Sequence, residues 1–383
     1  MQPRDFTALG ATTFDVLVVG GGIHGLTTAL DAAARGLKVA LVEAGDFAAA
    51  TSFNHQRTAH GGLRSLQSGR IGHARESIRE RRALARIAPR LLRPLPFMIG
   101  TYRSWIRSRL ALRAAFRFDR WLGRRRNDGL EPELHLPAAK LTSRAATLKL
   151  FAGVRQERLT GGANWYDYQI VHTNRLAIAF AEGAASRGAR LVNYAEAMSA
   201  LRTGERVTGM RVRDALTGAE LDVQARLTIN CAGPAVNRVM GMFGVTREIP
   251  LARAMNLVTS KAASDMALAA PGRSGAMLTL VPWHGRALIG TALSSEFTQP
   301  SDIAVTESEI EAFIADANEA FPALTLTRTD VVMVHRGIVP AQRGKGGRPE
   351  LPAAAQIIDH TSDRAPGAMT VVGVKYTTAR AVG

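Results

Sequence analysis

The stretch that decides the fold of this chain is Phe14-Asp15-Val16-Leu17-Val18-Val19-Gly20-Gly21-Gly22-Ile23-His24-Gly25. An apolar run that ends in G-x-G-x-x-G and opens a helix is typical of a dinucleotide-binding unit. Gly20 permits a tight turn, Gly22 lets the backbone approach a pyrophosphate, and Gly25 lets the helix pack closely on the strand. The positive end of that helix then faces the phosphates. The motif predicts a nucleotide site directly after the first strand.

The residues that follow the glycine motif complete the unit. A helix over 26–35 ends at Gly36, and a second apolar strand covers 38–42. Glu43 closes that strand, where an acidic side chain accepts hydrogen bonds from a ribose. The glycine motif alone does not decide between NAD and FAD.

Length and composition are those of a globular protein with two domains, or with one domain that carries a large insertion. The chain has 383 residues, of which 46% are hydrophobic and 21% charged. The sequence shows neither an uninterrupted apolar run of membrane-spanning length nor a signal-peptide pattern, so we expect a cytoplasmic protein. The single cysteine, Cys231, excludes an internal disulfide and a multi-cysteine metal site, and no metal is expected.

The net charge of +17 favours anionic partners such as phosphates or acidic lipids, although an arginine-rich coding bias produces the same charge. Nucleic acid is not expected, because no recognition motif accompanies the charge. The segment 102–122 mixes arginine with Trp105 and Trp121. Such a segment either lies on an anionic membrane, at the inner face of the cytoplasmic membrane, or covers the core with its arginine stems.

Three apolar strands end in glycine turns, near residues 20, 233 and 373. This spacing predicts one α/β nucleotide-binding domain built from the separate segments 1–70, 165–240 and 335–383. Residues 71–164 and 241–334 would form an inserted α+β substrate domain. Within these segments we expect helices over 167–188 and 307–320 and strands over 190–194, 206–214 and 219–223.

Seven motifs resemble the flavin-dependent glycerol-3-phosphate dehydrogenases, within the D-amino-acid-oxidase-like superfamily. They are Val19–Gly25, Glu43–Ser52, His60-Gly-Gly-Leu-Arg64, Asn230-Cys-Ala-Gly233-Pro234, Leu280-Val-Pro-Trp283, Ile289-Gly-Thr291 and Gly373-Val-Lys375-Tyr-Thr377-Thr378. The His60–Arg64 motif favours the glycerol-phosphate branch. The resemblance implies FAD as the cofactor and a Rossmann-like FAD-binding domain with D-amino-acid-oxidase-like architecture. It also implies that relatives continue beyond Gly383, so the flavin site would be incompletely supported here.

The resemblance implies which residues contact the cofactor. They are Gly20, Gly22, Ile23, Gly25, Glu43, Thr51, Ser52, Ala197, Gly233, Gly373, Lys375 and Thr377. Lys375 would stabilise a reduced, anionic flavin. Each of these residues also has an alternative role without a cofactor: Thr51 and Ser52 as helix caps, Gly233 as a plain turn, and Lys375 as a surface residue.

The catalytic candidates are His60, Arg64, Arg336 and Lys375. His60 is either the base that takes a hydroxyl proton or a structural histidine of its turn. The family reads Gly-Val-Arg-Pro where this chain has Gly337-Ile-Val339-Pro, so valine replaces the arginine.

Two further departures from the family are Arg253-Ala-Met-Asn256 in place of Lys-Gly-x-His and Gly290-Thr-Ala-Leu293 in place of Gly-Thr-Thr-Asp. The three changes predict an altered substrate geometry. We expect Arg64, Arg253 and Arg336 to bind a small anionic, hydroxylated substrate. Alternatively, Arg64 is a surface arginine that does not bind substrate.

The sequence therefore predicts an FAD-dependent oxidoreductase that transfers a hydride from glycerol 3-phosphate or a related compound to flavin. The electron acceptor, quinone or oxygen, stays open. One alternative is a superfamily enzyme acting on an amine, an amino acid or another hydroxy acid. Another is a flavin-binding protein without catalytic activity.

Overall fold

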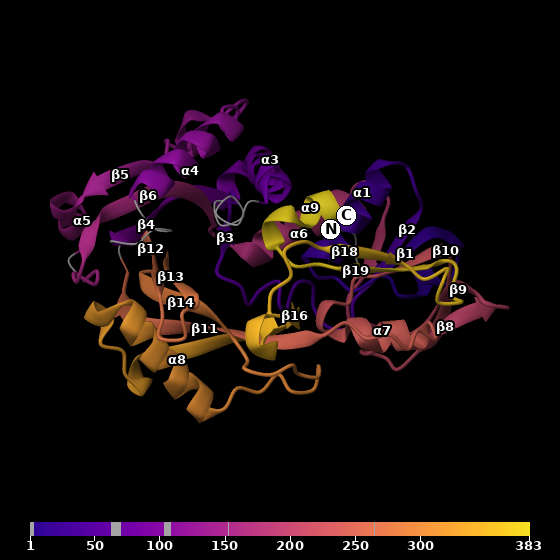
Figure 1. Cartoon of the computed structure of the whole chain (residues 1–383). Coiled ribbons are helices and arrows are strands. Elements are labelled where there is room, and N and C mark those ends of the chain that lie inside the picture. The colour runs from indigo at the N-terminus through magenta and orange to yellow at the C-terminus, as the bar shows by residue number, and fades with distance from the viewer. Residues whose placement is uncertain (1–3, 63–69, 103–108, 152, 264) are drawn as a thin grey trace.

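The computed structural model describes residues 4–62, 70–102, 109–151, 153–263 and 265–383. Two large sheets dominate it, one of eight strands and one of nine, with the chain crossing repeatedly between them (Figure 1). A two-stranded sheet, β16 (Gln342–Arg343) with β17 (Pro349–Glu350), lies apart from both. Short 3₁₀ turns occur at Thr7–Leu9, Pro89–Leu91, Pro132–Leu134, Gly233–Ala235, Pro322–Leu324, Arg328–Asp330, Lys345–Gly347 and Tyr376–Thr378.

The eight-stranded sheet has the order β18-β19-β10-β1-β2-β7, and the β8–β9 hairpin extends from β10. Its strands β19, β10, β1, β2 and β7 are mutually parallel. The bounds are β1 Phe14–Val19, β2 Val39–Val42, β7 Arg190–Val192, β8 Ala195–Thr203, β9 Arg206–Asp214, β10 Glu220–Asn230, β18 Gln356–Asp359 and β19 Ala368–Val372. The three glycine-ended strands expected from the sequence are therefore neighbours at the centre of one sheet, and the predicted α/β fold class is confirmed.

The two faces of β1 are covered differently because successive side chains of a strand point to opposite faces. Val16 and Val18 pack with helices α1 (Ile23–Ala34), α6 (Thr173–Ala185) and the short α9 (Ala379–Val382). Leu17 and Val19 pack with α7 (Val236–Met242) and the β8–β9 hairpin. All four side chains are buried, and each contributes about 1.5–3 kcal/mol to the free energy of folding.

The nine-stranded sheet has the order β15-β11-β14-β13-β12-β4-β6-β3, with β5 also paired to β6. The bounds are β3 Thr58–Ala59, β4 Leu92–Tyr102, β5 Lys140–Ser143, β6 Leu159–Ile170, β11 Leu251–Ala262, β12 Ala267–Pro271, β13 Met277–Trp283, β14 Arg286–Leu293 and β15 Val331–Pro340. Helix α8 (Glu307–Ala320) packs its apolar side chains on this sheet. Helices α3 (Ile71–Ile87), α4 (Arg109–Leu122) and α5 (Arg144–Leu150) lie towards the β4–β6 side (Figure 1).

Several expected elements have the predicted bounds. The acidic helix occupies 307–320, and Thr306 and Glu309 form a capping box at its start. The strand over 206–214 is β9. The helix expected over 167–188 begins only at Thr173, because residues 167–170 complete the long strand β6.

Pro94 and Pro96 lie inside β4. Proline cannot donate a ladder hydrogen bond, so it is tolerated where a strand lacks a neighbour on one side. Strand β4 pairs with β12 only at residues 97–99, which leaves both prolines with β6 as their single paired neighbour. The division into two domains stays a prediction, and its boundary at residue 335 falls inside β15.

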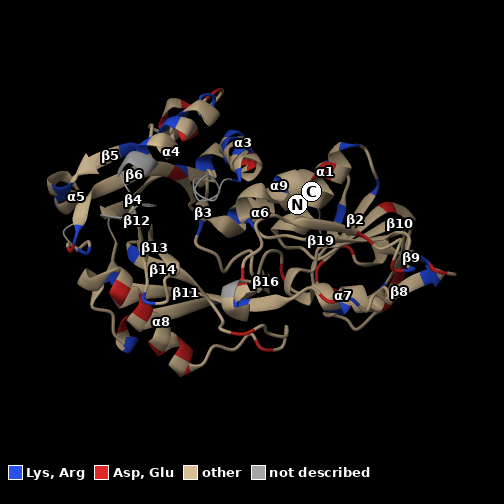
Figure 2. Ribbon diagram, viewed as in Figure 1, with Lys and Arg blue, Asp and Glu red and all other residues tan. Residues whose placement is uncertain are grey.

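Charge is unevenly distributed over the helices. Figure 2 shows basic residues along α3 and α4 and acidic residues along α8. Within the described residues, every helix is too short or too polar to cross a membrane.

Candidate cofactor and active site

The turn after β1 brings backbone donors to the carboxyl end of the parallel sheet. Gly20 has φ +108°, and a Cβ there would lie 2.6 Å from the Cys231 carbonyl oxygen, so only glycine fits. Gly22 is the N-cap of α1, and the next backbone N–H, of Ile23, donates to Ser52 Oγ at 2.9 Å. The helix therefore presents its positive end to a site bordered by Ser52.

Glu43 lies against the same turn. Its Oε2 accepts the Gly21 N–H at 2.6 Å, and its Oε1 accepts the Gly45 N–H at 2.8 Å. A Cβ at Gly21 would approach Phe47 Cδ1 to 2.7 Å, so the turn stays free of side chains. A helix N-terminus for phosphates beside a carboxylate for a ribose fits the two ends of an adenosine diphosphate moiety such as that of FAD.

The C-terminal motif closes the other side of this site. Gly373 follows β19, and a Cβ there would overlap the ring of His24. His24 is the third variable residue of the glycine motif, and sequence reasoning did not single it out. Its Nε2 is buried with no hydrogen-bond partner among the described residues, and burial lowers the pKa of His24 to about 4. Lys375, two residues after Gly373, is half-buried.

Two of the expected cofactor contacts, Ala197 and Gly233, are defined by their backbone position. Ala197 is buried in β8, opposite Val212 of β9. Gly233 has φ +52°, and the space around its missing Cβ is open. Thr51 donates its hydroxyl to the Ile338 carbonyl at 2.9 Å, which ties the loop after β2 to β15.

His60 is paired with a buried carboxylate. Its Nδ1 lies 3.4 Å from Asp167 Oδ2, and its Nε2 lies 2.8 Å from Thr58 Oγ1. The backbone N–H of His60 donates to Thr377 Oγ1 at 3.0 Å, so the His-Gly-Gly turn touches the C-terminal motif. The His60 side chain is 51% exposed, so one side of the imidazole remains open to solvent.

Asp167 is held as a carboxylate. Burial alone would raise its pKa, but the Arg81 charge and the hydrogen bonds from His60 and Gly61 lower the pKa below its usual value of 3.8. The Gly61 N–H donates at 2.6 Å, and the Arg81 guanidinium donates to the same oxygen. An ionised carboxylate beside Nδ1 favours the tautomer that leaves Nε2 as a proton acceptor. Sequence reasoning missed Asp167, although an acid inside the apolar strand at 163–170 was a usable signal.

The structure describes two of the three arginines expected to bind substrate, Arg253 and Arg336. Arg64 lies outside the described residues. Arg253 forms an ion pair with Glu309 of α8 and donates to the Asp302 carbonyl at 2.7 Å. Arg336 is exposed.

The strand register explains where Arg253 and Arg336 lie. Arg336 lies opposite Met255, which packs in the α8 core. Arg253 is two residues before Met255 in β11, so its side chain points to the same face. Asn256, on the other face, donates to the Asn54 carbonyl at 3.1 Å. The two arginines therefore lie on the face of the sheet that α8 covers, away from residues 51–60.

A buried basic cluster, which sequence reasoning missed, lies on the opposite face. It consists of His55, Arg57, Trp283 and His335, and we call it the Arg57 cluster. Arg57 is 2% exposed, and its carbon Cζ lies 4.1 Å from the ring centroid of Trp283. Its φ is +58°, a left-handed conformation that costs a non-glycine residue about 1 kcal/mol or more. Burial lowers the pKa of Arg57 to about 10, so it stays charged at neutral pH.

The two histidines of the Arg57 cluster are neutral. Burial, with the Arg57 charge, lowers the pKa of His335 to about 4 and that of His55 to about 3. His335 is 1% exposed and contacts the Trp283 ring edge to face, with centroids 5.4 Å apart. His55 stacks on Tyr376 at 4.5 Å, which joins the cluster to the C-terminal motif.

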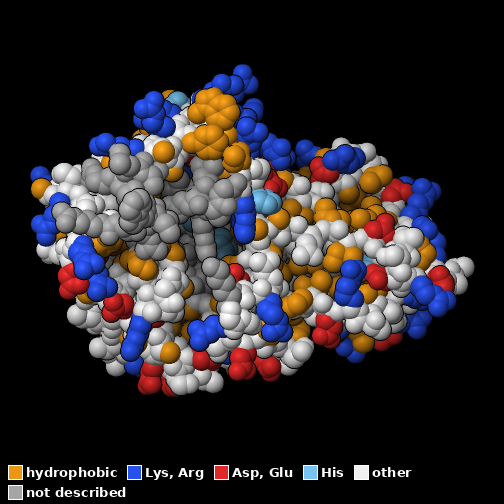
Figure 3. Space-filling model, viewed as in Figure 1, with side chains coloured by type: hydrophobic (Ala, Val, Ile, Leu, Met, Phe, Trp, Pro, Cys, Tyr) orange, Lys and Arg blue, Asp and Glu red, His pale blue; other side chains and the backbone are white. Residues whose placement is uncertain are grey.

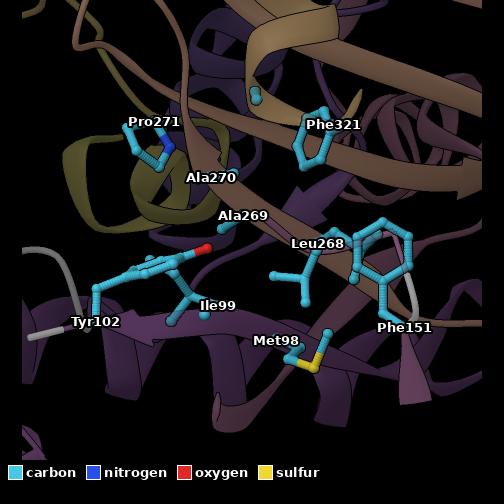
Figure 4. Close-up of a pocket in the computed structure, with 12 residues that line it drawn as sticks. Met98, Ile99, Tyr102, Phe151, Leu268, Ala269, Ala270, Pro271 and Phe321 are labelled. Carbon is cyan, nitrogen blue, oxygen red and sulfur yellow. The ribbon is translucent and has the colours of Figure 1, made fainter. Parts of the chain in front are cut away.

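An apolar pocket lies elsewhere, between β4, β12 and the end of α8 (Figure 4). Met98, Leu268, Phe151 and Phe321 line it, and Tyr102 is the titratable side chain at its edge. A pocket without a group that titrates near neutrality offers no base for a reaction. In the described part of the chain, no three His, Cys, Asp or Glu side chains are grouped as a metal site.

The neutral, buried His335 predicts a loss of stability in acid. Between pH 6.5 and about 4 the unfolded state binds a proton that the folded state excludes, so the free energy of unfolding falls as pH falls. The loss attributable to His335 is at most about 3 kcal/mol. Urea unfolding of the wild type and His335→Gln across this range measures it, with the variant losing less stability. Equal slopes for the two proteins contradict the prediction.

Comparisons with known proteins identify the family. The model of the FAD dependent oxidoreductase family, DAO, matches residues 15–382. Glycerol-3-phosphate dehydrogenase of Synechocystis sp. is 31% identical, over 99% of this chain and 70% of its own length. The Mycobacterium leprae protein of the same name is also 31% identical, over 97% of this chain. The chain spans 62% of that relative and about half of the mitochondrial ones.

Solved structures agree on the fold. Glycerol-3-phosphate dehydrogenase from Bacillus halodurans, complexed with FAD, superposes with a TM-score of 0.73 at 24% identity, covering 98% of this chain and 64% of its own. L-alpha-glycerophosphate oxidase from Mycoplasma pneumoniae gives 0.69 at 16% identity, covering 97% and 93%. The expected resemblance and FAD as cofactor are confirmed, and the chain belongs to the FAD-dependent oxidoreductases of the D-amino-acid-oxidase-like family.

Proposed function

We propose that this protein oxidises glycerol 3-phosphate, or a closely related small anionic alcohol, by hydride transfer to FAD. The observation that carries the proposal is the His60–Asp167 pair, whose turn hydrogen-bonds Thr377 of the C-terminal motif. A proton acceptor thus lies next to the segment that borders the cofactor site. The relatives named glycerol-3-phosphate dehydrogenase support this substrate.

The residues that would hold FAD come from four parts of the chain. The glycine turn and the α1 N-terminus would bind the pyrophosphate, Glu43 the ribose, and Lys375 would face the flavin with a positive charge. The full set is Gly20, Gly22, Ile23, Gly25, Glu43, Thr51, Ser52, Ala197, Gly233, Gly373, Lys375 and Thr377. FAD, when bound, supplies the hydride acceptor that amino-acid side chains lack.

His60 would take the hydroxyl proton of the substrate at Nε2. Asp167 accepts the hydrogen bond from Nδ1–H and stabilises the imidazolium that forms, so it acts as a positioning residue. The substrate hydroxyl would replace the Thr58 hydroxyl, which contacts Nε2 at 2.8 Å. Arg64 remains the proposed anchor for the substrate anion, whereas Arg253, engaged by Glu309, and Arg336 lie on the face of the sheet that α8 covers, away from His60.

The deciding experiment is anaerobic addition of glycerol 3-phosphate to the purified yellow protein. Loss of the oxidised-flavin absorbance band is expected, because hydride transfer reduces the flavin. Hydroxy acids, amino acids and amines form the comparison panel. Bleaching only by a panel compound would reassign the substrate, and bleaching by none would favour a flavin-binding protein without catalytic activity.

Replacing either member of the His60–Asp167 pair should slow that bleaching. His60→Gln should lower the rate about 100-fold or more, because a positioned general base contributes at least that much. Asp167→Asn should lower it about tenfold, because the imidazolium that forms loses its anionic neighbour. Asp222→Asn removes the acid of an exposed ion pair with Arg211 and is the control.

The double variant, His60→Gln with Asp167→Asn, separates positioning from damage to the fold. It should be no slower than His60→Gln alone, because Asp167 acts through His60. A further loss of rate in the double variant would mean that Asp167 only supports the structure. Wild-type rates in His60→Gln would remove His60 from the mechanism.

We also propose that α4 contacts an anionic membrane surface. The reduced flavin would pass its electrons to a quinone there; oxygen is the alternative acceptor. Leu112 and Phe116 of α4 are buried, whereas Phe118 and Trp121 are exposed and stacked. Figure 3 shows hydrophobic side chains beside basic ones at the top of the view, where α3 and α4 lie. Arginine beside exposed aromatic rings is typical of helices at anionic lipid interfaces.

Vesicle sedimentation tests the membrane contact. The protein should bind phosphatidylglycerol vesicles at low salt and dissociate at high salt, because salt screens the attraction. Trp121→Ala should weaken binding severalfold, whereas Leu216→Ala, an equally exposed hydrophobic side chain on the β9–β10 turn, should not. Binding of the protein to neutral vesicles only, or to neither anionic nor neutral vesicles, contradicts the proposal.

A further inference from the structure

Arg57 differs from the other enclosed arginines in its electrostatic environment. Arg81 is paired with Asp167, Arg253 with Glu309, and Arg126 with Asp119. Within the described residues, no carboxylate lies within 4.0 Å of the Arg57 nitrogens, yet its side chain is 2% exposed. A buried charge without a counter-charge is costly, so the site calls for an anion.

The unsatisfied hydrogen-bonding atoms of the molecule are concentrated here. Among the described residues, ten buried side-chain nitrogen or oxygen atoms have no hydrogen-bond partner. Six of them belong to the Arg57 cluster: Nε and Nη2 of Arg57, Nε2 of His55, Nε1 of Trp283, and both ring nitrogens of His335. Buried polar atoms are normally paired, so this concentration marks a place for a ligand.

Most of these atoms are donors. His55 Nδ1 accepts the backbone N–H of Arg57 at 3.1 Å, so the neutral ring carries its proton on the unpartnered Nε2. The Trp283 indole nitrogen and the two arginine nitrogens are donors only. The missing partner is therefore rich in acceptor oxygens.

The guanidinium of Arg57 is already oriented for such a partner. Nη1 donates to Thr173 Oγ1 at 2.7 Å, and the rings of Trp283 and Phe53 lie 4.1 and 4.7 Å from Cζ. The unpartnered Nε and Nη2 form one edge of the planar group. That edge matches two oxygens of a phosphate or a carboxylate.

His55 and Arg57 of the Arg57 cluster lie on the segment that joins the cofactor turn to His60. Ser52, at the start of this segment, accepts the Ile23 N–H, and His60, at its end, hydrogen-bonds Thr377. Between them, His55 stacks on Tyr376. An anion bound at Arg57 would thus belong to a ligand of the same site.

We propose that Arg57, with His55, Trp283 and His335, binds an oxyanion, the phosphate or carboxylate group of a ligand. This inference deepens the proposed function and rests on it in part, since the substrate phosphate is one source of the oxyanion. The FAD pyrophosphate is the other source. Both present the same chemistry to the Nε–Nη2 edge, and the experiment separates them.

The test uses the flavin-loaded protein and inorganic phosphate as the probe, at constant ionic strength. Binding is followed by the change in the flavin spectrum and by the thermal unfolding midpoint. Arg57→Gln should weaken phosphate binding about tenfold or more, because a hydrogen bond to a charged group accounts for about one to two decades of affinity. Arg211→Gln removes an exposed arginine of equal charge and should bind as the wild type does.

Trp283→Phe is the milder variant, because it keeps an aromatic ring over Arg57 while it removes the N–H donor. It should weaken phosphate binding severalfold, and it keeps the proposal testable if Arg57→Gln does not fold. Unchanged phosphate binding and unchanged flavin content in a folded Arg57→Gln or Trp283→Phe variant would overturn the proposal. A wild-type protein that binds neither phosphate nor FAD would also overturn it.

The flavin content of purified Arg57→Gln distinguishes the two sources. A wild-type ratio of FAD to protein, with phosphate binding lost, assigns the oxyanion to the substrate. A ratio below half, with FAD affinity reduced about tenfold, assigns it to the cofactor. Phosphate binding needs no turnover, so Arg57-dependent binding without bleaching by glycerol 3-phosphate would retain this inference and reject the proposed function.

Discussion

The structure depends on the close backbone contact between the glycine turn after β1 and the end of β10. The Cys231 N–H donates to the Val19 carbonyl at 2.8 Å, and Gly20 passes so near the Cys231 carbonyl that a side chain is excluded. This contact aligns the carboxyl ends of β1 and β10, and β19 joins them on the far side of β10. Three segments that are far apart in the sequence thereby form one edge, and the helix N-terminus, Glu43 and the C-terminal motif meet there.

A second constraint is the segment 51–60, which connects the two sheets. Thr51 hydrogen-bonds the Ile338 carbonyl, Gln56 the Thr279 carbonyl, and His60 the Thr377 hydroxyl. These bonds span sequence separations of 287, 223 and 317 residues. Because both ends of the segment are anchored, its polar side chains have defined positions between the cofactor edge and the nine-stranded sheet.

Two charged groups that include residues of this segment differ in how their charge is compensated. The His60–Asp167–Arg81 group is internally compensated, since the Asp167 carboxylate receives hydrogen bonds from a guanidinium, a backbone amide and an imidazole. The Arg57 guanidinium has aromatic faces and one hydroxyl in place of a carboxylate. Aromatic faces offset part of the cost of desolvating a cation. The compensated group suits proton transfer, and the uncompensated one suits anion recognition.

The sequence alone determined the nucleotide-binding unit, because G-x-G-x-x-G, the flanking apolar strands and Glu43 are local and obey steric rules that act within about 30 residues. It also determined the ends of α8, where Thr306 and Glu309 form a capping box. Its predictions were less accurate where neighbours decide the outcome: residues 167–170, expected in a helix, joined β6.

Only the tertiary structure decided which polar side chains meet. Arg253 and Arg336 lie on the α8 face of their sheet because of the β11–β15 register, which no local pattern encodes. Asp167 meets His60 across 107 residues, and Arg57 meets Trp283 across more than 200. Strand register and sheet order set these contacts, and both follow from the packing of the whole chain, since shifting a strand by one residue turns every side chain to the opposite face.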